Sequence, residues 1–171
     1  MSLISLTTPR LLLTRLTVAD AEFICKLTTD PEWLKQIGDR GVTDITSAIS
    51  YIESAHLAMY SQYGVGLLKV TEVDSLQPVG VCGLMQRNAY DLPDLGYALL
   101  PEFRGKGYAA EACKSIVDWC LEQQYQFLFA KVLPSNSSSI HVLEKLGFSY
   151  QYPEHDAGEI LHIYQRSFTQ C

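Results

Sequence analysis

The chain has 171 residues, of which 47% are hydrophobic and 19% are charged, and its formal net charge is −6. This length suits one domain with a substantial core and is short for two, and the composition excludes a disordered chain. An acidic balance also argues against a nucleic-acid-binding surface, which would carry a basic excess. We therefore expect one domain over residues 1–171, with no nucleic-acid partner and a charge that suits an amine-bearing partner.

Apolar runs such as residues 11–13 and 98–100 are far shorter than the roughly 18 residues that indicate a membrane span. The first residues lack the basic start and long apolar stretch of a signal peptide. The five cysteines form no Cys-x-x-Cys pair, and the four histidines form no His-Glu-x-x-His cluster. We expect a cytoplasmic protein with reduced thiols, no membrane partner and no metal site.

The N-terminal part of the chain predicts one strand and two helices. Thr17 followed by Asp20 resembles a capping box that opens the first helix, and Asp30 with Pro31 ends it. Apolar residues at helical spacing predict the second helix, which ends near Gly64, and the segment between the helices is expected to be irregular. The expected strand, helix, irregular segment and helix cover residues 10–16, 17–29, 32–44 and 45–64.

The rest of the chain predicts three strands in an antiparallel meander, and then helices and strands that alternate. Asn136 or a serine after it can cap the last helix, and Gly147 ends that helix. The three strands of the meander are residues 65–73, 79–86 and 95–100. A helix, a strand, a helix and two strands follow at residues 107–124, 127–133, 136–147, 148–152 and 160–168. The first of these helices is amphipathic, and its predicted buried face consists of Ala109, Ala112, Cys113, Ile116 and Cys120. The order is βααβββαβαββ.

Residues 94–109 join a predicted strand to a predicted helix through glycines and basic residues. Free amide groups at a helix start and the helix dipole both favour a phosphate there. Gly105 and Gly107 let the backbone approach such a ligand closely, and Arg104 and Lys106 add positive charge. The segment therefore predicts a site for an anion such as a pyrophosphate.

Other interpretations of the same segment exist. The glycines could serve only the geometry of a turn. Residues 105–110 also match the dinucleotide fingerprint Gly-x-Gly-x-x-Ala. Against it, residues 131–135 after the next strand include no acidic residue, and the roughly 60 residues that remain are too few for a doubly wound sheet. A Walker loop is excluded because no Gly-Lys-Ser/Thr sequence is present.

Four segments carry a resemblance to a known family and occur in its order and spacing. They are Thr8-Pro9-Arg10-Leu11-Leu12-Leu13, Gly96-Tyr97, residues 104–109, and Asn136-Ser137-Ser138-Ser139 running on to Glu144-Lys145-Leu146-Gly147-Phe148. The chain resembles the GCN5-related N-acetyltransferases (the GNAT superfamily), and within it the RimJ/RimL-like branch of ribosomal-protein N-terminal acetyltransferases. Over nearly the whole chain, the resemblance implies a single α/β (α+β) domain with a mixed, mostly antiparallel central sheet flanked by helices.

The resemblance also implies an acyltransferase that uses acetyl-CoA as co-substrate and no metal. The pyrophosphate of coenzyme A would lie on the loop formed by Arg104, Gly105, Lys106, Gly107, Tyr108 and Ala109. The pantetheine arm would run along the central strand, where Leu99 and Leu100 would offer main-chain hydrogen bonds and one amide would polarise the thioester carbonyl. Asn136 would contact the same arm, although an ordinary helix N-cap explains this residue equally well.

The amine of the acceptor attacks the thioester directly in most of the family. Many members carry a tyrosine as general acid for the departing thiolate, but this chain has Leu143 at that position. Ser139 or a water is the replacement candidate, and Ser139 is also expected to contact the cofactor. Its alternative role is that of a helix-start residue. Glu102 and Asp94 are candidate bases acting through a water, and each could equally be a solvated carboxylate.

The acceptor is the part of the function that the residues define least. An α-amine, with a pKa of about 7.7 to 8.0, is partly neutral near pH 7, whereas a lysine amine with a pKa of about 10.4 is almost wholly protonated. We therefore expect the α-amine of a protein or peptide, with Tyr97 and Trp33 as candidates to line the groove or simply to pack. A small-molecule amine such as an antibiotic or polyamine, and a non-catalytic acyl-CoA-binding module, are the alternatives. Dimers are common in the family, so a homodimer is one expected assembly.

Overall fold

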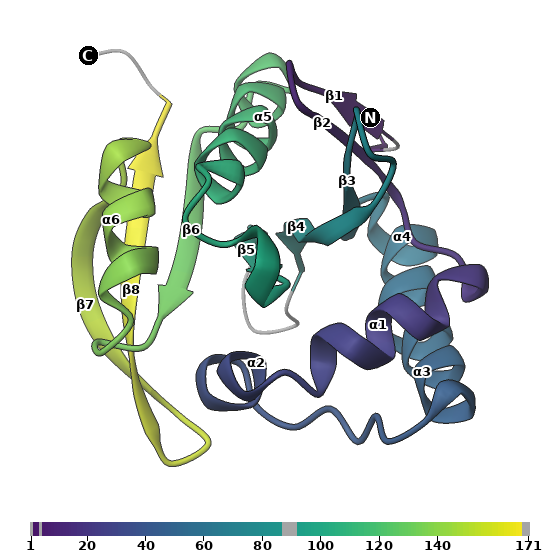
Figure 1. The fold of residues 1–171 in the computed structure, drawn as a ribbon. Helices are drawn as coiled ribbons and strands as arrows, with labels where there is room; N and C mark the ends of the chain where they lie inside the picture. Colours follow the sequence, from purple (N-terminus) through teal and green to yellow (C-terminus); the bar gives the residue numbers. More distant parts are fainter. Residues whose placement is uncertain (1, 4, 87–91, 169–171) are drawn as a thin grey trace.

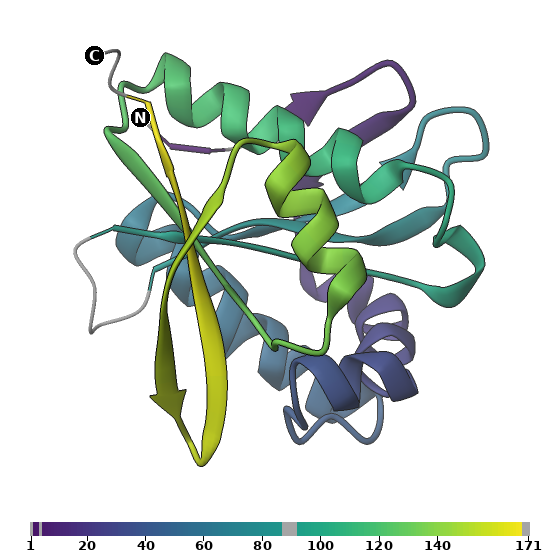
Figure 2. The same ribbon diagram turned by 90° about the vertical axis from the view of Figure 1, so that its left-hand side faces the viewer.

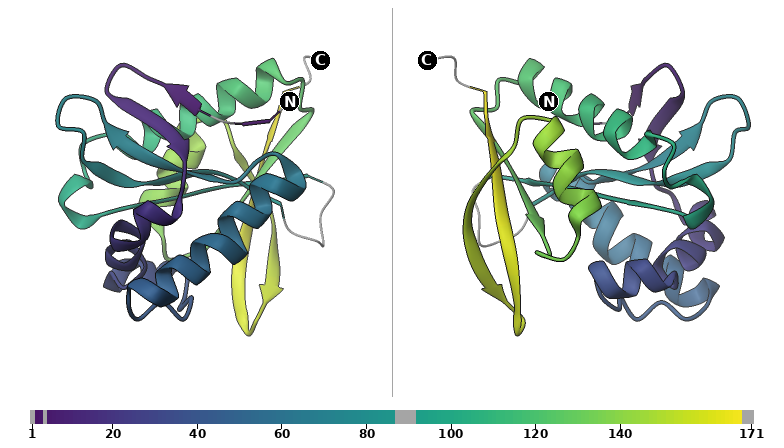
Figure 3. Two further views of the ribbon diagram at one scale, coloured as in Figure 1. Left: turned by 90° about the vertical axis from the view of Figure 1, so that its right-hand side faces the viewer. Right: turned by 60° about the vertical axis from the view of Figure 1, so that its left-hand side comes forward.

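An eight-stranded sheet in the order β1-β2-β3-β4-β5-β6-β8-β7 runs through the computed structural model, which describes the chain apart from residues 1, 4, 87–91 and 169–171. Neighbouring strands are antiparallel except β5 and β6, which are parallel. Helices α1 to α4 cover one face of the sheet, and α5 and α6 cover the other (Figures 1, 2 and 3). The mixed, mostly antiparallel sheet and its flanking helices confirm the predicted single α/β domain.

The N-terminal region contains two elements that the sequence interpretation missed. The short strand β1 precedes the predicted strand, and helix α2 lies in the segment expected to be irregular. The elements here are β1 (Ser5–Thr7), β2 (Leu11–Arg15), the 3-10 turn η1 (Val18–Asp20), α1 (Ala21–Thr28) and α2 (Pro31–Gln36). The signal for α2 was present, because Asp30 accepts hydrogen bonds from the Glu32 and Trp33 amides at 3.1 and 3.2 Å and Pro31 occupies the first helical position. Asp30 and Pro31, which were predicted to end the first helix, therefore also begin α2.

The second predicted helix is present over its expected length but is not uniform. It consists of α3 (Ile45–Tyr51), the π-helical segment η2 (Ile52–Leu57) and α4 (Ala58–Tyr63). Gly64 ends it in the left-handed conformation, with φ of 70°, as helix-stopping glycines commonly do. Hydrophobic spacing indicates a helix but does not distinguish a π-helical turn within it, so this detail was not predicted.

The meander and the C-terminal half follow the predicted order. The elements are β3 (Leu67–Glu72), β4 (Pro78–Met85), β5 (Asp94–Leu99), the 3-10 turn η3 (Pro101–Phe103), α5 (Tyr108–Glu122), β6 (Phe127–Val132), α6 (Ser137–Lys145), β7 (Ser149–Asp156) and β8 (Glu159–Ser167). The last two strands form one hairpin that is longer than predicted, and β7 is exposed along its length because it lies at the edge of the sheet.

The core is continuous from the N-terminal strands to α5. Ala112, Cys113, Ile116 and Cys120 of α5 are all 0% exposed, which confirms the predicted buried face of this helix. At Gly80 in β4, a Cβ would lie 2.1 Å from the carbonyl oxygen of Ala98, so only glycine permits this close approach of β4 and β5. None of the helices in the described part of the chain is both long and apolar enough to cross a membrane.

Candidate active site

The parallel strands β5 and β6 pair only at the first two residues of β5. The partners are Asp94 with Phe129 and Leu95 with Ala130, whereas β5 pairs with β4 along its whole length. The edge of β5 that faces away from β4 is therefore not covered by β6 from Gly96 to Leu99. An uncovered strand edge offers main-chain donors and acceptors to a ligand that can lie along it.

Leu99 and Leu100 differ in the direction of their amides. The Leu100 N–H donates to Val79 O at 2.9 Å, and Leu100 O accepts from the Phe103 N–H at 3.0 Å. Because backbone groups point alternately to the two sides of a strand, the N–H of Leu99 points away from β4 and toward the uncovered edge. Of the two residues, Leu99 is the one whose amide faces the gap between β5 and β6.

The predicted anion loop lies between η3 and α5. Gly105 and Gly107 have φ values of 74° and 80°, a conformation that favours glycine. A Cβ at Gly105 would meet no atom within 4 Å, so space is open on that side of the loop. The first helical hydrogen bond of α5 runs from Glu111 N–H to Gly107 O at 3.1 Å, and the amides of residues 108–110 therefore precede the helical ladder. These amides and the helix dipole form a site suited to a phosphate.

The two basic side chains of the loop have different surroundings. Arg104 Nη2 donates to Asp30 Oδ2 at 2.6 Å and to Leu99 O at 2.9 Å, which ties the loop to the start of α2 and to the end of β5. Lys106 Nζ lies 5.2 Å from the centre of the Phe103 ring. Arg104 therefore anchors the loop, and its positive charge is paired with the Asp30 carboxylate.

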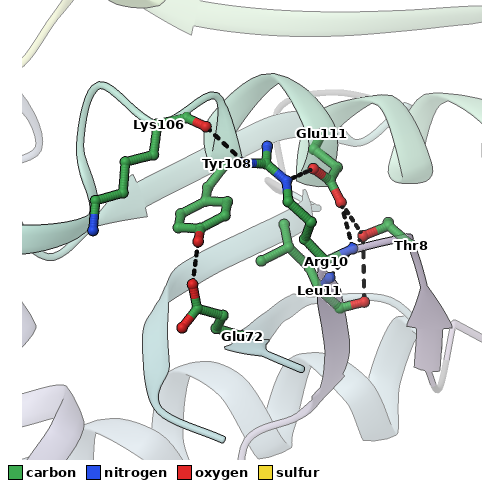
Figure 4. A network of polar contacts seen from close by, with 7 residues as sticks. All are labelled: Thr8, Arg10, Leu11, Glu72, Lys106, Tyr108 and Glu111. Atoms are coloured by element: carbon green, nitrogen blue, oxygen red, sulfur yellow. Dashed lines mark hydrogen bonds and ion pairs between the residues drawn. The ribbon is translucent and has the colours of Figure 1, made fainter. Parts of the chain in front are cut away.

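Tyr108 offers the site its backbone rather than its side chain. The residue is 6% exposed, and its hydroxyl donates to the Glu72 carboxylate, as Figure 4 shows. The guanidinium carbon of Arg10 lies 4.5 Å from the centre of the Tyr108 ring. The Tyr108 ring is thus held at its hydroxyl end by Glu72 and on one face by Arg10. The following residue, Ala109, is half-buried.

Asn136 and Ser139 lie at the start of α6. Asn136 Oδ1 accepts hydrogen bonds from the Ser139 N–H at 3.2 Å and from Ser138 Oγ at 3.1 Å, so Asn136 is the N-cap of this helix. The Ser139 side chain is hydrogen-bonded to Tyr97 of β5. Burial raises the pKa of Tyr97 to about 12, against the opposite effect of that hydrogen bond. Leu143, at the position of the family tyrosine, is 3% exposed and packs in the core.

Glu102 and Asp94 are the candidate bases, and Trp33 is the second aromatic candidate for the acceptor groove. Glu102 Oε1 lies 2.5 Å from Lys26 Nζ, and this hydrogen bond holds the pKa of Glu102 below its usual value. Asp94 is buried at the start of β5. Trp33 is 4% exposed, and its Nε1 donates to Gly38 O at 3.2 Å, so it packs within the N-terminal helices.

Cys82 is fully buried, with its Sγ 3.7 Å from Cys113 Sγ. Burial raises the pKa of the Cys82 thiol well above its usual value, so this residue is a packing thiol and not a thiolate nucleophile. Among the residues that the structure describes, no three histidine, cysteine or acidic side chains group as metal ligands would.

Two features of the site were not assigned from the sequence. One is the contact between Tyr97 and Ser139, which depends on how β5 and α6 approach each other. The other is the contact of Thr8 and Arg10 with the glycine loop and Glu111 (Figure 4). Thr8 and Arg10 lie in one of the segments that carry the family resemblance, and this was the sequence feature that could have pointed to their contact with the loop.

The family model described as the acetyltransferase (GNAT) domain matches residues 10–149, so the chain belongs to the GNAT acetyltransferase family and is an acyltransferase, as predicted. The family uses acetyl-CoA.

The uncharacterized N-acetyltransferase p20 of Bacillus licheniformis is 29% identical over 173 residues, which cover 97% of this chain and 96% of that protein. The crystal structure of an acetyltransferase from Agrobacterium tumefaciens strain C58 is 28% identical, with a TM-score of 0.80 over 97% of this chain and 95% of that one. A ribosomal-protein-S5-alanine acetyltransferase from Vibrio fischeri shares the fold, at 16% identity and a TM-score of 0.79 over 96% of both chains.

Proposed function

We propose that this protein transfers the acetyl group of acetyl-CoA to a primary amine, and that its acceptor is the α-amine of a protein or peptide. The observation that carries the proposal is the uncovered edge of β5, which leads directly into the glycine loop at the start of α5. A strand edge beside a phosphate site matches a cofactor that joins an amide-containing arm to a pyrophosphate.

In this proposal, the pyrophosphate lies on the amides of residues 105–109, beside the charges of Arg104 and Lys106. The pantetheine arm adds to the uncovered edge of β5. Asn136 uses Oδ1 for its cap, and its amide nitrogen is the group that would contact the arm. Leu100 shapes the turn into the loop through its main-chain bonds to Val79 and Phe103.

The reaction is a direct transfer. The neutral amine attacks the thioester carbonyl carbon, the new C–N bond forms, the C–S bond breaks, coenzyme A leaves as a thiolate, and the nitrogen gives its surplus proton to water. The Leu99 amide would polarise the carbonyl. Ser139 would give a proton to the thiolate, with the Tyr97 hydroxyl orienting it, although a thiol of pKa about 8.5 needs little help to leave near neutral pH.

The proposal of an α-amine acceptor is supported by the weakness of Glu102 as a base. Glu102 is paired with Lys26 and has a lowered pKa, which makes its carboxylate a weak proton acceptor. An amine that is already partly neutral near pH 7 suits such a site better than a lysine amine. The net charge of −6 suits a basic acceptor, and the fold is also that of the Vibrio fischeri ribosomal-protein acetyltransferase.

The test is calorimetric titration with acetyl-CoA, followed by assays of coenzyme A release with peptides bearing free α-amines, with lysine side chains and with small-molecule amines. We expect one acetyl-CoA per chain and preferential acetylation of α-amines. If acetyl-CoA binds but only small-molecule amines are acetylated, the acceptor is a small-molecule amine and not the α-amine of a protein or peptide. Binding without release of coenzyme A across the whole panel would indicate an acyl-CoA-binding module.

Gly105→Asp tests the placement of the cofactor. A Cβ at Gly105 would meet no atom within 4 Å, so the substitution adds a carboxylate to the open side of the loop beside the proposed pyrophosphate site. We expect acetyl-CoA affinity to fall by about two orders of magnitude, equivalent to about 3 kcal/mol, because the carboxylate would repel the pyrophosphate. The matched control is Gly158→Asp in the β7–β8 turn, where φ is 84° and a Cβ would meet no atom within 4 Å. Equal affinities of the two variants would show that the pyrophosphate lies elsewhere.

A further inference from the structure

Arg10, the residue just before β2, reaches the glycine loop from the far end of the chain. Its Nη1 donates to Lys106 O at 2.9 Å, and its Nε donates to Glu111 Oε2 at 2.6 Å (Figure 4). Its guanidinium also stacks on the Tyr108 ring. One side chain thus contacts the loop, the first residue of α5 and the first turn of α5.

Glu111 holds Arg10 in this position. Besides the Arg10 side chain, its Oε1 accepts from the Arg10 backbone N–H at 2.9 Å and from Thr8 Oγ1 at 2.6 Å. Thr8 Oγ1 in turn accepts from the Leu11 N–H at 2.9 Å, which orders the turn between β1 and β2. The Glu111 side chain is 18% exposed, so the carboxylate is largely shielded and three donors from one turn satisfy it.

The bond to Lys106 O has a consequence for the anion site. In a trans peptide unit the C=O of one residue and the N–H of the next point in opposite directions. Arg10 holds the Lys106 carbonyl on its own side, so the Gly107 N–H points to the opposite side. Glycine at 107 would otherwise leave this peptide plane free to rotate, because it accepts either sign of φ.

We propose that Arg10, held by Glu111 and Thr8, is the positioning residue of the pyrophosphate loop: it fixes the Lys106 carbonyl and thereby directs the Gly107 amide toward the phosphate. The inference rests on the proposed function, since it requires coenzyme A to bind at this loop. A preset amide avoids the cost of ordering the loop during binding, which is the usual gain from preorganisation.

Two variants separate positioning from charge. Arg10→Lys keeps the positive charge but loses the planar fork that bonds Lys106 and Glu111 together. Glu111→Ala removes a negative charge from the neighbourhood of the anion, so electrostatics alone would strengthen binding. Positioning predicts that both variants weaken coenzyme A binding, roughly tenfold each, as expected for the loss of about one hydrogen bond to a charged group.

The experiment is calorimetric titration of each variant with coenzyme A, with thermal melting to establish that it is folded and a ¹⁵N spectrum to follow the Gly107 amide. Lys114→Ala is the matched control, because it breaks an exposed ion pair with Asp118 at 2.6 Å on the same helix. It should bind coenzyme A as the wild type does. The Gly107 amide signal should shift in both test variants and stay in the control.

The outcomes are distinguishable. Wild-type protein that does not bind coenzyme A contradicts the proposed function itself. Wild-type binding together with unchanged affinity in Arg10→Lys, or unchanged or tighter binding in Glu111→Ala, overturns the positioning role. If Glu111→Ala does not fold, Arg10→Lys decides alone, because a purely electrostatic role predicts that lysine preserves affinity.

Discussion

His56 is a polar residue with an unusual setting. It lies in the π-helical segment η2, is 5% exposed, and its Nε2 has no hydrogen-bond partner among the described residues. Its ring contacts the Tyr51 ring edge to face, with ring centres 5.0 Å apart. Burial lowers the pKa of His56 to about 4 from its usual 6.5, because the charged form would be poorly solvated.

This shift predicts a pH dependence of stability. Between about pH 6.5 and pH 4 the unfolded chain binds a proton at His56 that the folded chain does not, so the free energy of unfolding falls as the pH is lowered through this window. The loss at the acid end is of the order of 3 kcal/mol. Urea unfolding at pH 7 and pH 4.5 should show a larger loss for wild-type protein than for His56→Gln. Equal losses would mean that His56 is not buried in its neutral form.

At the scale of elements, the loop is held by α2 as well as by β2. Asp30 caps α2 through the Glu32 and Trp33 amides and pairs with Arg104 of the loop at 2.6 Å. Burial would raise the pKa of Asp30, but the bonds from Arg104 and the amides outweigh it and the pKa is lowered. The carboxylate therefore stabilises the fold above its usual pKa, and this contribution is lost as the pH falls through the lowered value.

Two substitutions of Asp30 separate the cap from the ion pair. Asp30→Asn keeps a capping oxygen and loses the charge opposite Arg104, whereas Asp30→Ala loses both. We expect Asp30→Ala to lower the free energy of unfolding by ~2 to 4 kcal/mol, about 1 kcal/mol of it from the cap, with Asp30→Asn between it and the wild type. Urea unfolding at pH 7 measures this order. If Asp30→Asn lowers the free energy of unfolding as much as Asp30→Ala does, the whole effect belongs to the ion pair with Arg104.

The elements also show where sequence reasoning stops. The amphipathic face of α5 and the glycine that ends α4 were predicted because they depend on local spacing and on φ. Strand β1 has only three residues and no pattern of its own, and it exists because β2 pairs with it. The π-helical turn of η2 likewise follows from packing rather than from periodicity.

For the whole molecule, the short pairing of β5 with β6 is the feature on which the proposed binding of coenzyme A depends. If coenzyme A lies along this edge, its binding should protect amides of β5 and of the loop at residues 104–110 from hydrogen exchange. At a concentration one hundred times the dissociation constant, mass action adds about 2.7 kcal/mol to the free energy of unfolding. Hydrogen exchange followed by mass spectrometry measures the protection of these amides and the gain in the free energy of unfolding, with the β7–β8 hairpin as internal control. Protection confined to other segments would contradict the site.

The homodimer stays a prediction of the family resemblance. The exposed edge strand β7, with Tyr150 and Tyr152 each nearly half exposed, is the natural place to look for such a contact. Light scattering of the full chain is the direct measurement.

The sequence by itself determined the family, the order of nearly all elements and the position of the glycine loop at the start of α5, because motif spacing, hydrophobic periodicity and glycine conformation are local properties. Only the tertiary structure decided which of Leu99 and Leu100 faces the gap, where the Arg104 side chain lies, and that Arg10 and Glu111 hold the loop. These depend on strand register and on contacts between residues 74 to 101 positions apart, which no local pattern records.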